Sequence, residues 1–266
     1  MGKALELIGT SATAPGAGAA FTAVAGNSLQ VRDHRQKAYL IDISSIRQTP
    51  GFFRLTSPLL HDSTVGIQVL APQIINQMFP PVQELFSQDQ LTAFGSGSAV
   101  AGDIEISTYT TFYEDLPGVE ANLITADELR RRGEEIYSWQ NQVVATGAGG
   151  YTGSQAITTL QDQLKANREY AILGAAVAVS GVPNAAIRYV GPDWGNLGVG
   201  VPLDGDDRGN NTFYFEMLSK FTSLPTVPVF NAANKALTFI SMLCNENGVS
   251  VQVNTTAVLL APKARK

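Results

Sequence analysis

The chain has 266 residues, of which 44% are hydrophobic and only 15% are charged. This length suits one large domain or two domains of common size, with ample apolar material for their cores. The net charge of −5 excludes the basic balance of a general nucleic-acid coat. A single cysteine, Cys244, excludes an intrachain disulfide and a cysteine metal cluster, and its apolar neighbours predict a buried, inert thiol.

The N-terminal part of the chain shows no targeting signal and little periodicity. Residues 1–8 lack a long apolar stretch and a cleavage site, so we expect no signal peptide. Residues 9–28 are rich in Gly, Ala, Ser and Thr and predict a loose arm, with a first strand near residues 19–25. The most apolar run, residues 171–179, is far shorter than the roughly 20 residues that span a bilayer, so it predicts a buried strand.

The rest of the first half predicts short strands separated by turns. The clearest covers residues 103–114, where one face alternates from Ile104 to Phe112, as in a half-buried strand. The other expected elements are strands at residues 29–32, 38–46, 52–56 and 65–70 and a helical turn at residues 82–87.

One helix is predicted, over residues 126–138. Thr125 is its N-cap candidate and Glu128 stands at the third helical position, which together make a capping box. Leu129 and Ile136 are seven residues apart and share one stripe of this helix.

The second half again predicts strands with turn signals between them. Their expected ranges are residues 139–146, 156–161, 169–179, 185–190, 197–203, 212–219, 227–230, 236–244 and 249–260. Strands at this spacing are typical of a sandwich or barrel rather than a parallel α/β sheet.

Residues 53–69 and 187–203 share a pattern at a fixed offset of 134 positions (188 − 54 = 134). An offset close to half the chain indicates a duplicated domain rather than a solenoid. The alternative is two unrelated strand–turn–strand units that both need Pro and Gly at bends. The identical pairs are Arg54 and Arg188, Pro58 and Pro192, Val65 and Val199, and Gly66 and Gly200.

Residue patterns for catalysis are sparse. Both histidines, His34 and His61, belong to the first half, which excludes a metal-binding double cupin. The run His61-Asp62-Ser63 has triad residue types, but neighbours in sequence cannot adopt the geometry of a triad. The Gly-rich residues 147–153 match no phosphate-loop pattern. We expect no enzymatic activity.

Two polar segments are candidates for binding. Asp204, Asp206 and Asp207 place hard oxygen ligands within four positions, as a structural calcium ion prefers, and a plain solvated turn is the alternative. No other cofactor is expected. At the C-terminus, Lys263, Arg265 and Lys266 form a basic cluster suited to an anionic membrane surface or a genome, with a solvated tail as the alternative.

Two consecutive all-β halves, the repeated Arg54–Gly66 and Arg188–Gly200 segments and a short helical connector together resemble a viral coat protein. The arrangement is similar to the double jelly-roll major capsid proteins of tectiviruses, adenoviruses and compact corticovirus-like phages. The resemblance implies eight strands per roll and homotrimers that pass for hexamers in an icosahedral shell. It also implies a place in the virion after synthesis in the host cytoplasm. The partners would be neighbouring capsomers, penton and minor capsid proteins, and an internal membrane or genome.

The expected fold class is therefore all-β, with two consecutive eight-stranded jelly rolls and a short connecting helix. We place the first roll and its N-terminal arm in residues 1–118, the helical connector in residues 119–139, and the second roll with its basic tail in residues 140–266. The alternative function is a two-domain carbohydrate-binding protein of the lectin or receptor-binding kind. An exposed Trp194 beside the acids at 204–207 would serve as its sugar platform.

Overall fold

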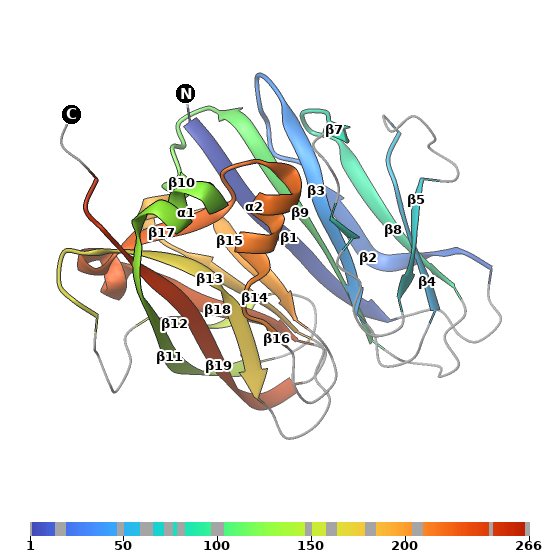
Figure 1. Cartoon of the computed structure of the whole chain (residues 1–266). Coiled ribbons are helices and arrows are strands. Elements are labelled where there is room, and N and C mark those ends of the chain that lie inside the picture. The colour runs from blue at the N-terminus through green and yellow to red at the C-terminus, as the bar shows by residue number, and fades with distance from the viewer. Residues whose placement is uncertain are drawn as a thin grey trace.

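The described strands of the chain form four antiparallel sheets, two from each half (Figure 1). No described helix is long and apolar enough to cross a membrane. The computed structural model describes residues 2–13, 20–46, 51–58, 66–71, 77–78, 83–96, 104–146, 151–157, 164–178, 185–203, 210–244 and 247–263.

The first half folds into two facing sheets that enclose one core. One sheet has the order β1-β9-β3-β6, with β7 also paired to β3, and the other has the order β2-β8-β4-β5. The strands are β1 Gly2–Thr13, β2 Thr22–Gln30, β3 Ala38–Ile46, β4 Gly51–Thr56, β5 Ile67–Ala71, β6 Gln77–Met78, β7 Glu84–Leu85, β8 Gln90–Ser96 and β9 Ile104–Leu116.

The second half repeats this arrangement. One sheet has the order β10-β17-β13-β19-β11, with β16 also paired to β13, and the other has the order β12-β18-β14-β15. The strands are β10 Leu123–Ile124, β11 Gly133–Thr146, β12 Thr152–Ala156, β13 Glu169–Ala178, β14 Ala185–Val190, β15 Gly198–Leu203, β16 Asn210–Asn211, β17 Val227–Asn231, β18 Phe239–Cys244 and β19 Asn247–Leu260. The helices are α1 Ala126–Arg132, η1 Pro192–Trp194, α2 Tyr214–Thr222 and η2 Ala232–Leu237.

Both halves have the strand order of a jelly roll. If β6 and β7, and likewise β16 and β17, are each taken as one interrupted strand, each half has eight strands and β10 is an added edge. In each half the first, eighth, third and sixth strands then form one sheet, and the second, seventh, fourth and fifth form the other. Two such sheets face to face are a jelly roll, so the predicted all-β double jelly roll is confirmed.

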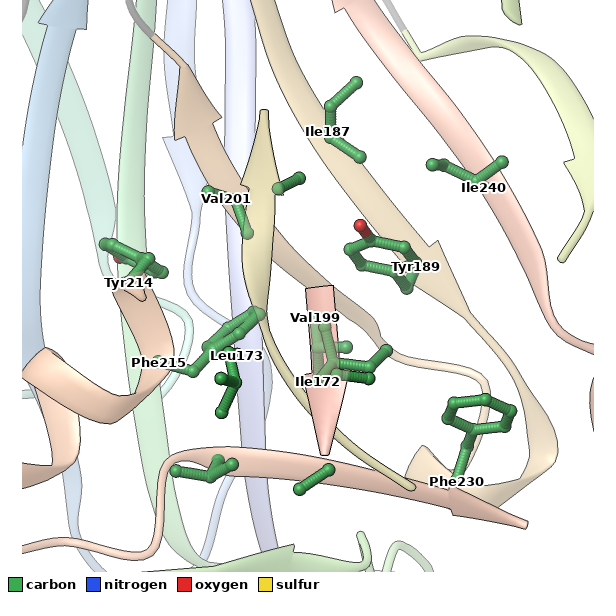
Figure 2. Packing of buried hydrophobic residues seen from close by; sticks show 14 of the residues in the cluster. Ile172, Leu173, Ile187, Tyr189, Val199, Val201, Tyr214, Phe215, Phe230 and Ile240 are labelled. Atoms are coloured by element: carbon green, nitrogen blue, oxygen red, sulfur yellow. The ribbon is translucent and has the colours of Figure 1, made fainter. Parts of the chain in front are cut away.

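The second roll has a dense core that continues toward the first. Figure 2 shows Ile172, Tyr189, Val199 and Phe230 directed into the space between its sheets, and all four side chains are fully buried. Leu5 and Phe112 of the first roll belong to the same cluster. The first roll has a smaller core of its own around Leu40, Phe53, Leu91 and Tyr113.

The fixed offset of 134 holds for one strand and fails for the next. Strand β14 begins and ends 134 residues after β4 (185 − 51 and 190 − 56), and both are the fourth strand of their roll. Arg188 pairs with Gly200, however, whereas Arg54 pairs with Gln68 rather than Gly66. The expected overlay of Gly66 on Gly200 is therefore wrong, because the paired residues are two positions further apart in the first roll (68 − 54 = 14) than in the second (200 − 188 = 12).

The predicted loose arm over residues 9–28 is wrong where it meets β1. Residues 9–13 belong to this strand, which pairs with β9 along its length and buries Leu5 and Leu7. The segment has weak strand propensity, so its partner and the burial of its apolar face determine its conformation. Strand β8 was likewise not predicted, and the expected helical turn at residues 82–87 contains β7 instead.

The mid-chain helix is shorter than predicted. The Thr125 hydroxyl accepts from the Glu128 N–H, as the capping box requires, but α1 ends at Arg132. From Gly133 the chain is extended and pairs with β19, so the predicted helix over 126–138 and the helical connector over 119–139 both include part of β11. Leu129 is buried, whereas Ile136, expected on the same stripe, is 71% exposed.

The predicted strand over residues 212–219 is a helix. Phe213, Tyr214 and Phe215 favour a strand by propensity, yet α2 buries side chains at helical spacing, including Phe215, Leu218 and Thr222.

The two rolls pack side by side through unlike sheets. Strand β1 of the first roll lies against β15 and β18 of the second. Leu7 and Ile106 form a buried cluster with Ala186 and Leu243 across this boundary. Gly200 is required here, because a Cβ at this position would lie 2.4 Å from Leu7 Cδ2 and 2.6 Å from the Ile187 carbonyl oxygen.

We expect Gly200→Ala to lower the free energy of unfolding by about 1–3 kcal/mol, because the added methyl forces the two rolls apart. Ser154→Ala, at an exposed strand position of the same sheet, should change it by less than about 0.5 kcal/mol. Chemical denaturation of both variants measures the difference. Equal stabilities for the two variants would contradict the tight approach of the rolls at Gly200.

Candidate assembly interface

The described residues offer little chemistry of the catalytic kind. No described group of three or more His, Cys, Asp or Glu side chains could hold a metal ion. His34 is buried with its Nδ1 2.9 Å from the Gln36 carbonyl oxygen and its ring edge against Tyr113. His61 lies outside the described residues. Cys244 is fully buried, as its apolar neighbours predict.

A cleft of about 560 Å³ lies beside β1 and β2 and reaches Leu197 of the second roll. Its buried acid, Glu6, accepts two hydrogen bonds of 2.7 and 2.8 Å from Arg32 Nε. Burial raises the pKa of Glu6, while Arg32 and, more weakly, Tyr113 and Arg188 act in the opposite direction. The ion pair is closed within the chain, so the cleft presents a satisfied carboxylate rather than a reactive one.

The boundary between the rolls contains a buried carboxyl group. Asp42 of β3 lies opposite α2, and the Tyr214 hydroxyl donates a 2.7 Å hydrogen bond to Asp42 Oδ2. The Thr110 hydroxyl lies 2.8 Å from the same Tyr214 oxygen, which completes a polar chain from one roll to the other. No described residue donates to Asp42 Oδ1. Burial raises the pKa of Asp42 to about 8, against the smaller effect of the Tyr214 hydrogen bond.

Each of the repeated arginines lies over the ring of an equivalent aromatic residue. The Arg188 guanidinium lies 4.0 Å from the Tyr151 ring centre, and the Arg54 guanidinium lies 4.5 Å from that of Phe21. Phe21 directly precedes β2 and Tyr151 directly precedes β12, so the two aromatic residues are structurally equivalent. Arg54 also lies 4.7 Å from the Phe94 ring centre. The repeat in the sequence therefore preserves a cation–π contact on the outer face of each β4-type strand.

The surroundings of this contact differ between the rolls. Tyr151 packs against the cluster that joins the two rolls, so the second roll's outer face is covered. On the first roll the same sheet carries Phe52, which is 52% exposed, and exposed Gln68 and Gln90. The β12-β18-β14-β15 face of the second roll is thus part of an interface within the chain, whereas the equivalent β2-β8-β4-β5 face of the first roll has exposed side chains.

The residues singled out from the sequence are not brought together in the described structure. Asp204, Asp206 and Asp207 lie outside the described residues, so the calcium site stays a prediction. Lys263 is exposed and lines one small pocket together with Glu169. Arg265 and Lys266 lie outside the described residues.

Trp194 is buried, which corrects the expectation of an exposed sugar platform. Its side chain is 0% exposed and its indole N–H donates to the Val229 carbonyl oxygen at 3.1 Å. The helix η1 that carries it is fixed by Asp193, whose carboxylate accepts hydrogen bonds from Asn231 and Asn234. Trp194 is thus a core residue of the second roll.

Two features of the sequence relate to this interface. Asp42 stands in the strongly apolar run Leu40-Ile41-Asp42-Ile43, where a carboxylate is unusual and points to a special environment. The repeated Arg54 and Arg188 were recognised as a repeat, but their aromatic partners come from distant strands, so the sequence could not reveal the contact.

We expect Asp42→Asn to change the pH dependence of stability. The pKa of Asp42 is higher in the folded chain than in the unfolded chain, so its neutral form stabilises the fold at low pH. This contribution is fully present below about pH 4 and is lost as the pH rises through about 8. Across this window the unfolding free energy of the natural chain should fall relative to the variant by up to about 1.4 kcal/mol per pH unit. Denaturation at pH 4.5, 6 and 8 measures the trend, and parallel curves would contradict it.

No protein family model matches the chain, and no curated protein matches it. Several solved structures align over most of it, including the following three. The exported protein XepA of PBSX is 12% identical, with 96% of this chain and 86% of that chain covered and a TM-score of 0.28. A chain of the Sulfolobus turreted icosahedral virus is 10% identical, with coverages of 99% and 81% and a TM-score of 0.27. The major capsid protein of bacteriophage PM2 is 10% identical, with coverages of 97% and 100% and a TM-score of 0.22. These TM-scores are too low for the matches to bear on function.

Proposed function

We propose that this chain is a structural major capsid protein whose homotrimers form the pseudo-hexameric units of an icosahedral viral shell. The observation that carries the proposal is the packing of two rolls of identical strand order through unlike sheets. The β1-β9-β3-β6 sheet of the first roll meets the β12-β18-β14-β15 sheet of the second.

Contact between unlike faces is heterologous and can be repeated from one roll to the next. Three chains would supply six similar lobes, and six similar lobes tile a near-hexagonal lattice. In this proposal the chain has no enzymatic activity, because shell assembly depends on complementary faces rather than on reactive groups. Its place is the virion, after synthesis in the host cytoplasm.

The proposal extends to the partners expected from the sequence. Neighbouring capsomers, penton proteins and minor capsid proteins would contact the outer surfaces of the trimer. The basic tail at Lys263, Arg265 and Lys266 would face an internal membrane or the genome. The marked N and C ends of the chain lie at the same end of the molecule, which is compatible with one end of the trimer facing inward (Figure 1).

The lectin alternative loses the feature that favoured it. An aromatic platform at Trp194 requires an exposed indole, and this indole is buried and hydrogen-bonded to the backbone. The acids at 204–207, the other part of that expected platform, lie outside the described residues.

We expect the purified chain to be a trimer of about 85 kDa, three times its mass of 28.3 kDa. The trimer should persist on dilution to micromolar concentration, and its melting temperature should depend little on salt, because few charges contribute. Light scattering coupled to size exclusion measures the mass, and negative-stain microscopy should show hexagonal outlines. A stable monomer near 28 kDa with no assembly would contradict the proposal.

A further inference from the structure

We propose that the open outer face of the first roll binds the open outer face of the second roll of another copy, in the register that the internal interface already shows. This inference rests on the proposed function and assigns the surfaces through which copies meet. The first surface, the β2-β8-β4-β5 face, carries Phe52, Arg54 and Gln68. The second, the β11-β19 face, carries Ile136, Ser138, Gln140 and Gln252.

The two surfaces lie on opposite sides of the chain. Strands β4 and β5 are at one lateral edge of the molecule and β11 and β19 are on the other side (Figure 1). A single chain therefore cannot close the contact on itself. A second copy is the occupant that continues the internal interface, because it brings together the same two unlike types of sheet that meet inside the chain.

The first surface is the equivalent of one that is already buried. Strand β4 matches β14 residue by residue, so Phe52 takes the place of Ala186 and Arg54 that of Arg188. The pairing of Arg54 with Gln68 and of Arg188 with Gly200 makes Gln68 the equivalent of Gly200. In the second roll, Ala186 and Gly200 contact the β1 side of the first roll.

A β-bulge found in both rolls shows which residues of the second surface are equivalent to the buried residues of β1. In β3 the residue Ile41 is extra between Leu40 and Asp42, which pair with Thr111 and Thr110. In β13 one residue is likewise extra between Ile172 and Gly174, which pair with Ala257 and Thr256. The two bulges lie at the same place in the two rolls, and bulges fix the register of neighbouring strands.

This register extends to the first strand of each roll. Glu6 pairs with Thr111, and Tyr137 pairs with Ala257, so Glu6 and Tyr137 are equivalent. The outward residues Leu5, Leu7 and Gly9 of β1 therefore correspond to Ile136, Ser138 and Gln140 of β11. Leu5 and Leu7 are buried in the internal interface, whereas Ile136 is 71% exposed and Ser138 and Gln140 are exposed.

The chemistry of the two open faces is compatible with close contact. The exposed positions used here, Ile136, Ser138 and Gln140 of β11 and Gln252 of β19, are uncharged. The exposed Glu134 and Glu135 at the start of β11 are already paired with Arg168 and Lys165. Each face has an exposed apolar side chain, Ile136 on one and Phe52 on the other. Arg54 is held against two rings, so its charge is already partly screened. Contact would remove apolar area from water without stranding an isolated charge.

The internal contact between Leu7 and Gly200 predicts that Ser138 of one copy lies against Gln68 of the next. The double variant Gln68→Cys/Ser138→Cys tests this, since both positions are exposed and the natural Cys244 is fully buried. Mild oxidation should give covalent dimers and trimers on a non-reducing gel that reduction removes. Gln68→Cys/Ala236→Cys is the matched control, with its second cysteine at an exposed position of η2, the helix that packs against β12, β17 and η1.

A second pair of variants tests the same face without new cysteines. Phe52→Glu should convert the trimer to a folded monomer, because it places a charge in the contact. Phe86→Glu changes an equally exposed phenylalanine of the same roll, 49% exposed beside β7, and should leave the trimer intact. Circular dichroism confirms that both variants are folded.

The outcomes separate this inference from the proposed function. A natural chain that is monomeric at all concentrations would overturn both. A natural trimer in which the cysteine pair links no better than its control, and Phe52→Glu leaves the mass unchanged, would overturn only the pairing of faces. Covalent species that continue beyond three copies would support the pairing and contradict the closed trimer.

Discussion

The contact between unlike sheets of the two rolls is the constraint on which the rest of the molecule depends. A jelly roll hides the inner faces of its two sheets but leaves both outer faces in water. In this chain one outer face of each roll is buried against the other, through Leu7, Ile106, Ala186 and Leu243. The glycine at 200, the hydrogen bonds of Tyr214 and the continuation of the second core into the first roll all follow from that approach.

The sequence was most informative where alternation and turn residues act locally. Strands such as β3, β4, β9 and β14 and the all-β class followed from periodicity, and the 134-residue offset correctly indicated a duplicated fold. Strand β1 was missed because its pairing with β9 joins residues about a hundred positions apart, which no local pattern encodes. Helix α2 was misread because three aromatic residues favour a strand until tertiary packing selects a helical spacing.

The interface could be inferred from the sequence only in outline. The repeat of Arg54 and Arg188 was visible, and so was the acid in the apolar run around Asp42. What those residues contact depends on which outer face is covered, and that is a property of how two whole rolls meet. Trp194 shows the opposite case: a turn context suggested exposure, but the short helix η1 folds back so that its indole reaches the Val229 carbonyl.

The covalent link between the rolls has a consequence for how contacts respond to dilution. Two rolls on separate chains would find each other only at a sufficient concentration, whereas two rolls joined through α1 meet at a fixed effective concentration. The inter-roll contact is therefore formed during the folding of each chain and does not depend on the protein concentration. Under the proposed assembly, a ring of six lobes needs three molecules to meet rather than six. Half of the contacts in the ring are already made within the chains before any two molecules collide.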